Sequence, residues 1–295
     1  MIRSPAGPVR VGGVELRNHL VLAAGILGTT GASLTRILHA GAGGVVTKSI
    51  GPEPLDGHPG PCLVVLGDGV LNAMGLPNPS RHFVEELAHL SGEPVVVSIF
   101  GGDPEEFARV ASWFAGSAAG FELNLSCPHA EGYGSAIGTD PVLVEECTRA
   151  VKALGRSTWV KVTPNVTEIA EIGAAAERGG ADAIVAINTV KAMRISVPMG
   201  RPVLGNRFGG LSGKAIFPIA VRCVYELYEA CEVPIIGCGG ISTAENVVEM
   251  MMAGASAVEI GSAVLEGTEI FREIARDLYT PDGREPGEIV GCAHE

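Results

Sequence analysis

The sequence is poor in basic residues and in aromatic residues, and its cysteines are not clustered. Lysine and arginine together number 21 against 33 aspartates and glutamates, which gives a formal net charge of −12. Such a field repels phosphate backbones and anionic membrane surfaces, so we expect no nucleic-acid partner. The seven cysteines include no CxxC and no set at zinc or iron–sulfur ligand spacing. We therefore expect free thiols, no metal site and a reducing, cytoplasmic location.

Long apolar runs are also missing. The longest stretch without Asp, Glu, Lys or Arg, from Asn18 to Thr35, contains three glycines and several polar residues. A membrane-spanning helix needs about 20 mostly apolar residues. The first residues, MIRSPAGPVRVGG, also lack the apolar segment of a secretory signal. These absences predict a protein without a membrane partner.

Short apolar runs do recur, and a segment of helical periodicity follows each of them. This alternation is typical of βα units around a parallel sheet. Asp103-Pro104 and Asp140-Pro141 have the composition of helix starts, and further helices are expected over 165–178, 213–230 and 243–253. The eight expected strands are Val21–Gly25, Gly44–Ile50, Pro94–Gly101, Gly120–Cys127, Thr158–Pro164, Ala181–Thr189, Val233–Gly240 and Ala257–Ala263. Eight such units predict one α/β domain over residues 1–295, a (β/α)8 (TIM) barrel.

Three segments exceed what a minimal barrel needs. Residues 1–20 alternate around Gly12-Gly13 and predict a hairpin on the barrel floor. Residues 51–80 and 190–212 are expected to be long insertions after the second and sixth strands. Because loops at the carboxyl ends of barrel strands carry active sites, these insertions are expected to contact substrate.

Polar residues and glycines occupy the carboxyl ends of successive expected strands, where a buried strand would ordinarily be apolar. In a barrel these ends converge on one face, so the set predicts an active site. Each residue alone has a simpler explanation, as a rim residue or a turn residue. The glycine pairs after the last two strands suit a bound phosphate, with tight turns as the alternative. The positions are Thr47-Lys48-Ser49, Ser98, Asn124, Cys127, Lys161, Asn188-Thr189, Gly239-Gly240 and Gly261-Ser262.

Two glycine-rich segments do not form nucleotide motifs. The segment 25–31 lacks the GxGxxG spacing, and Lys48 stands about twenty residues on where an acidic residue is needed. Gly213-Lys214 lacks the first P-loop glycine, because Phe208 occupies that position, and Ala215 replaces the magnesium-binding Ser or Thr.

The motifs together resemble the class 1 dihydroorotate dehydrogenases over nearly the whole chain. They are TKS at 47–49, NAMGLPN at 72–78, ELNLSCP at 122–128, VKVTPN at 160–165, INT at 187–189, GGLSG at 209–213, GCGGI at 237–241 and AGASAVEIGSA at 253–263. The stretches 200–206, 209–220 and 253–263 are most similar to the NAD-linked type B subfamily. This resemblance implies an FMN-dependent oxidation of dihydroorotate to orotate in pyrimidine biosynthesis.

The resemblance also implies a role for individual residues. Cys127 would be the base that removes the C5 proton, while hydride passes from C6 to FMN N5. The implied substrate contacts are Lys48, Asn72, Ala73, Met74, Gly75, Leu76, Asn124, Asn188 and Thr189. The implied FMN contacts are Ala24, Gly25, Lys48, Ser49, Ser98, Asn124, Lys161, Ile187, Gly213, Gly239, Gly240, Gly261 and Ser262, with Lys161 next to N1 and the last four at the phosphate.

Three residues depart from the family pattern. His129 stands where relatives have Asn, Ser98 where many have Asn, and Ala24 where many have Ser. The first change puts one substrate contact in doubt, and the other two affect expected flavin contacts.

The NAD-linked type implies a partner chain, because this sequence has neither a nucleotide-binding motif nor cysteines spaced for a cluster. The partner would be an iron–sulfur flavoprotein that carries FAD and [2Fe-2S], in a heterotetramer of two chains of each kind. The alternative within the class is a homodimer that reduces fumarate.

Three other classes remain as alternatives. A tRNA-dihydrouridine synthase shares the flavin barrel and the cysteine, but the charge of −12 disfavours RNA. A dihydropyrimidine dehydrogenase would not need Lys48 for a carboxylate. A phosphate-binding barrel without redox chemistry would bind no flavin.

Overall fold

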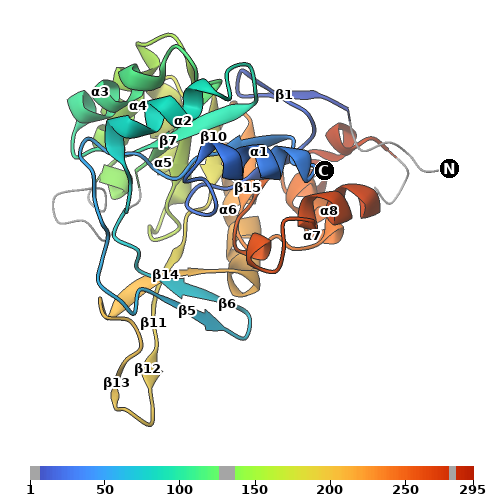
Figure 1. Cartoon of the computed structure of the whole chain (residues 1–295). Coiled ribbons are helices and arrows are strands. Elements are labelled where there is room, and N and C mark those ends of the chain that lie inside the picture. The colour runs from blue at the N-terminus through green and yellow to red at the C-terminus, as the bar shows by residue number, and fades with distance from the viewer. Residues whose placement is uncertain (1–6, 126–136, 279–283) are drawn as a thin grey trace.

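The computed structural model describes residues 7–125, 137–278 and 284–295 and contains a closed barrel of parallel strands (Figure 1). Around the barrel the order is β3 (Leu20–Leu22), β4 (Gly44–Val46), β7 (Val95–Ile99), β8 (Gly120–Asn124), β9 (Ser157–Val162), β10 (Ala183–Ala186), β15 (Ile235–Cys238) and β16 (Ala255–Ile260). The predicted (β/α)8 fold is therefore confirmed. The strands end earlier than predicted, because polar residues after β4, β10 and β15 turn into a cavity.

Helices on the outside of the barrel connect these strands (Figure 1). Asp103 caps α3, where its Oδ1 accepts a hydrogen bond from the Glu106 amide at 2.8 Å, and Asp140 caps α4 in the same way through the Val142 amide at 2.9 Å. Both predicted helix starts are confirmed. The helices are α1 (Gly31–His39), α2 (Phe83–Ala88), α3 (Pro104–Phe114), α4 (Pro141–Lys152), α5 (Ile169–Arg178), α6 (Phe217–Ala230), α7 (Ala244–Met252) and α8 (Ile270–Asp277).

Short 3-10 helices complete the connections. They are η1 (Ser80–His82), η2 (Ile137–Thr139), η3 (Lys214–Ile216), η4 (Ser262–Leu265), η5 (Pro286–Ile289) and η6 (Cys292–His294). Within the described ranges, no helix combines the length and the apolar character that crossing a bilayer requires.

The barrel strands are apolar on both faces, as strands between a barrel interior and a layer of helices must be. Val45 of β4 packs in the cluster between strands and helices, whereas its neighbour Val46 packs in the cluster inside the barrel. This alternation is the two-residue period of a strand. It explains why these runs lack the polar alternation of a half-exposed sheet.

The amino-terminal hairpin closes the floor of the barrel, as predicted. Strands β1 (Val9–Val11) and β2 (Val14–Leu16) pair antiparallel around Gly12 and Gly13, whose φ angles are 50° and 82°. The Trp159 indole, fully buried inside the barrel, donates to the Gly12 carbonyl at 3.1 Å. A Cβ on Gly12 would lie 2.5 Å from Trp159 Nε1, so this close approach requires glycine.

The two long insertions form a single sheet at the opposite end, which the sequence did not predict. β5 (Leu63–Leu66) and β6 (Gly69–Asn72) come from the first insertion, and β11 (Val190–Met193) and β14 (Phe208–Ser212) from the second. β6 pairs antiparallel with β14, which gives the order β11-β14-β6-β5. Between β11 and β14, an arm made of β12 (Ile195–Ser196) and β13 (Arg201–Pro202) projects away from the barrel (Figure 1).

Candidate functional site

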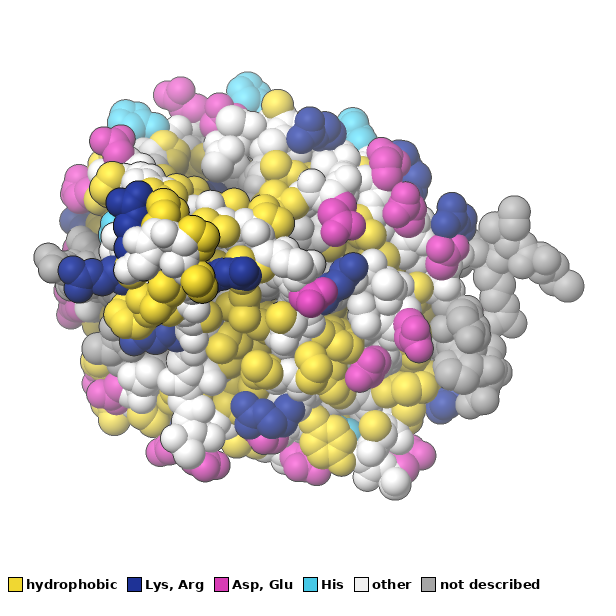
Figure 2. Space-filling model, turned by 90° about the horizontal axis from the view of Figure 1, so that it is seen from below, with side chains coloured by type: hydrophobic (Ala, Val, Ile, Leu, Met, Phe, Trp, Pro, Cys, Tyr) yellow, Lys and Arg dark blue, Asp and Glu magenta, His cyan; other side chains and the backbone are white. Residues whose placement is uncertain are grey.

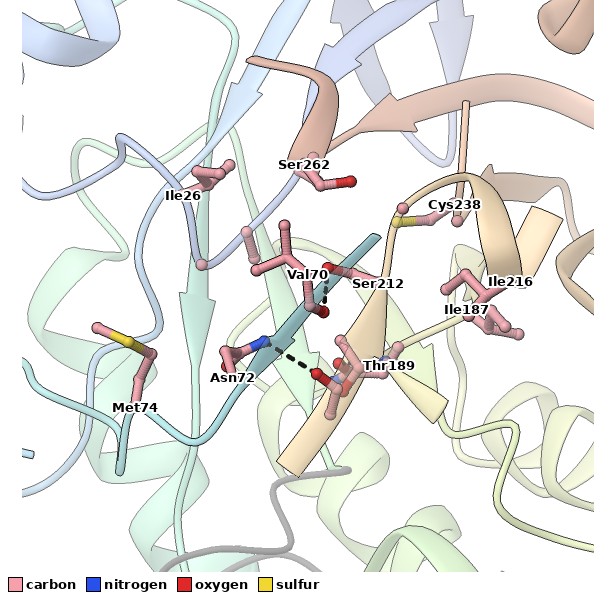
Figure 3. A pocket seen from close by; sticks show the side chains of 18 of the residues that line it. Ile26, Val70, Asn72, Met74, Ile187, Thr189, Ser212, Ile216, Cys238 and Ser262 are labelled. Atoms are coloured by element: carbon pink, nitrogen blue, oxygen red, sulfur yellow. Dashed lines mark hydrogen bonds between the residues drawn. The ribbon is translucent and has the colours of Figure 1, made fainter. Parts of the chain in front are cut away.

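A cavity of about 290 Å³ lies between the carboxyl ends of the barrel strands and the four-stranded sheet (Figure 3). Loops after strands and residues of the sheet contribute to its wall, and Asn72, Met74, Thr189 and Cys238 all border it in the close view. Mostly apolar walls with a few converging polar groups are typical of small-molecule sites. The position agrees with the predicted active-site face.

Most of the predicted site residues line this cavity. They are Ala24, Gly25, Lys48, Ser49, Asn72, Met74, Gly75, Leu76, Asn124, Lys161, Ile187, Asn188, Thr189, Gly213, Gly239, Gly240, Gly261 and Ser262. The predicted base Cys127 lies outside the described residues, and so does His129. The roles of all these residues stay predictions.

Among the predicted positions that the structure describes, Thr47, Ser98 and Ala73 do not line the cavity. Ser98 is fully buried, and its Oγ is 2.9 Å from Ser49 Oγ, so it supports a lining residue from behind. Ala73 is also fully buried, and its amide donates to the Cys62 carbonyl at 2.8 Å. Its contribution is to hold the backbone of the neighbouring lining residues in place.

A chain of hydrogen bonds fixes the orientation of two asparagine side chains. Asn188 Nδ2 donates to Asn124 Oδ1 at 3.1 Å, and Asn124 Nδ2 donates to Ser49 Oγ at 3.0 Å. The Thr189 amide donates to Asn188 Oδ1 at 2.8 Å. Since Ser49, Asn124 and Asn188 come from the ends of three different strands, β4, β8 and β10, the barrel itself orients these amides.

The four-stranded sheet is attached to the site by contacts from both insertions. Asn72 Nδ2 donates to the Gly210 carbonyl at 3.3 Å, and Ser212 Oγ donates to the Val70 carbonyl at 3.4 Å (Figure 3). A Cβ on Gly210 would lie 2.1 Å from Thr189 Oγ1, so the sheet approaches the end of β10 closely. These contacts hold Asn72 over the strand ends.

Lys161 is the most buried charge at the site, and two glutamates surround it. Its Nζ is 2.5 Å from Glu259 Oε2 and 3.7 Å from Glu122 Oε2, and both glutamate side chains are fully buried. Burial opposes the charge on Lys161, but the neighbouring acidic groups of Glu122 and Glu259 outweigh that effect and raise the pKa of Lys161. Lys161 therefore remains protonated at neutral pH.

Sequence reasoning missed both glutamates. The signal was nonetheless there, because each is an isolated acidic residue within an otherwise apolar strand, GFELN for Glu122 and ASAVEI for Glu259. Such positions are almost never charged unless a partner is present.

Other missed residues are mostly apolar, or belong to the unpredicted sheet. Cys238 could have been found, since it directly precedes Gly239. Burial raises the pKa of Cys238 to about 12, so its thiol stays neutral. The lining residues not predicted are Ala23, Ile26, Leu63, Val70, Gly210, Ser212, Ile216, Cys238, Ile241 and Leu265.

Bare glycine backbone forms two parts of the cavity wall, where a ligand could approach the main chain closely. A Cβ on Gly25, at φ 91°, would meet no atom within 4 Å, so the backbone there borders open space. At the other side Gly239 and Gly240 have φ angles of 131° and 75° and leave bare backbone in the wall. Only the short η4 follows Gly261, so backbone amides rather than a long helix would meet an anion there.

Comparisons with known proteins agree with this architecture. The family model described as dihydroorotate dehydrogenase matches residues 8–280. The catalytic subunit of dihydroorotate dehydrogenase B (NAD(+)) from Methanocella arvoryzae is 56% identical over 290 residues, which cover 96% of both chains. The protein of the same name from Pyrococcus abyssi is 50% identical over 293 residues, 97% of this chain and 98% of that relative. The crystal structure of DHODH from Eimeria tenella with ferulenol shares the fold, with a TM-score of 0.86 at 20% identity, and covers 99% of this chain and 89% of that chain.

Proposed function

The chain belongs to the dihydroorotate dehydrogenase family. On this premise we propose that the protein binds FMN in the cavity and oxidises dihydroorotate to orotate in pyrimidine biosynthesis. The observation that carries the proposal is the convergence of Lys48, Lys161 and the amides of Asn72, Asn124 and Asn188 on one cavity. Lysine ammonium and asparagine amide groups are suited to bind the carboxylate and the two amide edges of dihydroorotate and to lie beside the reducible ring of FMN.

Different residues of the cavity are proposed to bind the substrate and FMN. Asn72, Asn124 and Asn188 offer donors and acceptors to the amide edges of the pyrimidine, and Lys48 offers a cation to its carboxylate. Lys161 keeps a positive charge at the inner wall. FMN, when bound, supplies the acceptor for the hydride that leaves C6. Gly239, Gly240, Gly261 and Ser262 would hold its phosphate.

Cys127 completes the proposal as the base that takes the C5 proton. A thiol has an ordinary pKa of about 8.5, close enough to neutrality for proton transfer.

The test is the visible spectrum of the FMN-loaded chain before and after anaerobic addition of dihydroorotate. We expect the flavin absorbance to bleach. A flavin spectrum that does not respond would exclude dihydroorotate and favour another pyrimidine, and the absence of bound flavin would favour a barrel without redox chemistry.

The electron acceptor requires a second chain. The relatives from Methanocella arvoryzae and Pyrococcus abyssi are named catalytic subunits, which indicates a separate partner subunit. We propose an iron–sulfur flavoprotein with FAD and [2Fe-2S], in a heterotetramer of two chains of each kind, and a cytoplasmic location. NADH formation that depends on the partner would support this, whereas turnover with fumarate by this chain alone would contradict it.

The projecting arm supports the proposal of a partner. Figure 2 shows hydrophobic and basic side chains gathered on the side of the molecule that carries the arm. Val197 is 89% exposed, and Ile195 and Met199 are more than half exposed. From residue 183 to 225 the chain has basic residues and no acidic one, although the whole chain is acidic. A large exposed apolar patch commonly marks an interface.

A further inference from the structure

Glu122 and Glu259 have no role in the chemistry described so far, although both contact Lys161. Phe121 and Leu123 pack toward the helices, so the two-residue period turns Glu122 of β8 into the barrel interior. By the same alternation Glu259 of β16 points inward, between Val258 and Ile260. Lys161 of β9 meets both and also lines the cavity. The two glutamates therefore lie directly behind a residue of the site.

The charges in this cluster do not balance if all three groups are ionised. Two carboxylates and one ammonium would leave one negative charge among side chains that are at most 6% exposed. A buried unpaired charge is strongly destabilising. Among the described residues, neither oxygen of Glu122 nor Oε1 of Glu259 has a hydrogen-bond partner of ordinary geometry. One added proton removes the excess charge and supplies a donor.

The surroundings indicate where that proton belongs. Burial and the neighbouring Glu259 carboxylate raise the pKa of Glu122 well above its usual range, and Lys161 and Ser98 counteract this only in part. Glu259 makes the short contact to Lys161 and is the natural carboxylate of the pair. Among the described residues, Cys238 on β15 is a further titratable neighbour, and it carries no charge because burial raises its pKa to about 12.

We propose that Glu122 and Glu259 share one proton and form, with Lys161, an electrically neutral cluster that sets the charge presented to the bound flavin. The inference rests on the proposed flavin-dependent function. Both glutamates act through Lys161 and are positioning residues. Glu259 binds the ammonium group of Lys161 and offsets its charge. Glu122 carries the proton that keeps the net charge of the three side chains at zero.

The cluster has a consequence for the reduction potential. A net positive charge beside the flavin would favour its reduced form, so the neutral cluster keeps the midpoint potential lower than an unpaired lysine would. Loss of Glu259 alone lets Glu122 ionise and restore neutrality. Loss of both carboxyl groups leaves Lys161 as a net positive charge.

Infrared spectroscopy of the FMN-loaded protein tests where the proton lies. We expect a carbonyl stretch of a protonated carboxylic acid that persists across the neutral pH range and shifts in D₂O. The band should be absent from Glu122→Gln and present in Glu249→Gln, a control on an exposed glutamate of α7. Its absence from the unaltered protein, or its persistence in Glu122→Gln, would overturn the proposal.

A redox titration of the same proteins tests the effect on the flavin. Glu122→Gln replaces one neutral group by another and should leave the midpoint potential close to its original value. Glu122→Gln combined with Glu259→Gln should shift the equilibrium toward reduced flavin at least tenfold, about 30 mV for a two-electron couple. An equal shift in Glu122→Gln alone would contradict the shared proton. Neither measurement uses dihydroorotate, so a protein that shows the band but ignores dihydroorotate refutes the proposed function and keeps this inference.

Discussion

The floor and the mouth of the barrel are built on the same eight strands but differ in what fills them. At the floor the hairpin packs Val11, Val14 and Leu16 against Trp159 and closes the barrel with apolar side chains. At the mouth the strand ends carry Lys48, Asn124 and other polar groups around an open cavity. This difference indicates that residues important for stability and residues of the proposed active site lie at opposite ends of the barrel axis. A change at one end should therefore leave the property of the other end intact.

The largest expected effect is at the mouth and on chemistry alone. Cys127→Ala removes the proposed base, and general-base catalysis contributes about 10² to 10⁴ in rate. We expect the rate of flavin reduction by dihydroorotate to fall by that factor, measured by stopped-flow absorbance. Flavin binding and the melting temperature should stay unchanged. Cys62→Ala, at a half-buried thiol, is the matched control, and full activity of Cys127→Ala would remove Cys127 from the mechanism.

The corresponding effect at the floor is on stability alone. Trp159→Ala deletes the largest fully buried side chain of the floor together with its hydrogen bond to Gly12. Substitutions of this kind cost about 3 to 5 kcal/mol. We expect the free energy of unfolding in urea to fall by that amount, while the folded protein keeps its rate of flavin reduction. Trp113→Ala, at a partly buried tryptophan of α3, should cost less. Equal losses of unfolding free energy in the two variants would show that the floor contributes no more to stability than α3 does.

A smaller effect is expected from Lys48→Ala, again at the mouth. Loss of a charged hydrogen bond to the substrate carboxylate costs about 1.5 to 3 kcal/mol, about tenfold to a hundredfold in KM. We expect KM for dihydroorotate to rise and the free energy of unfolding to change by less than about 0.5 kcal/mol. Lys191→Ala, at a lysine that lies over Phe208 in the sheet, is the control. An unchanged KM in Lys48→Ala would separate Lys48 from the carboxylate.

The smallest effect on catalysis is expected on the arm, which belongs to neither end. Val197→Asp places a charge on the most exposed valine and should weaken assembly with partner chains, measured by the mass of the complex in solution. Reduction of bound flavin by dihydroorotate should be unaffected. Val142→Asp, at an exposed valine of α4, should leave assembly unchanged. A complex of unaltered mass in Val197→Asp would exclude the arm from the interface.

The regular part of the molecule could be predicted because its signals are local. Asp103 and Asp140 mark helix starts within four residues, and each barrel strand is a continuous apolar run. The lining residues at strand ends followed from the same reasoning, because the fold brings those ends together. The resemblance to a known family then supplied the roles that spacing alone left open.

What could not be predicted depends on contacts between distant residues. β14 has the sequence FGGLS, with two glycines that weaken a strand signal, and it becomes a strand because β11 and the distant β6 pair with it. Glu122 and Glu259 were missed for a related reason. Their partner Lys161 comes from a third strand, so an isolated acidic residue in an apolar run indicates that a partner exists but not which residue it is.

The pairing of β6 with β14 links Leu71 to Leu211, which are 140 residues apart. Closing so long a loop is slow compared with forming neighbouring βα units, so the sheet over the cavity belongs to the late stages of folding. A fragment that ends before residue 208 contains Lys48, Asn124 and Lys161 but lacks the strand that holds Asn72 over them. The binding site is thus a product of the completed chain, and neither half of the barrel carries it.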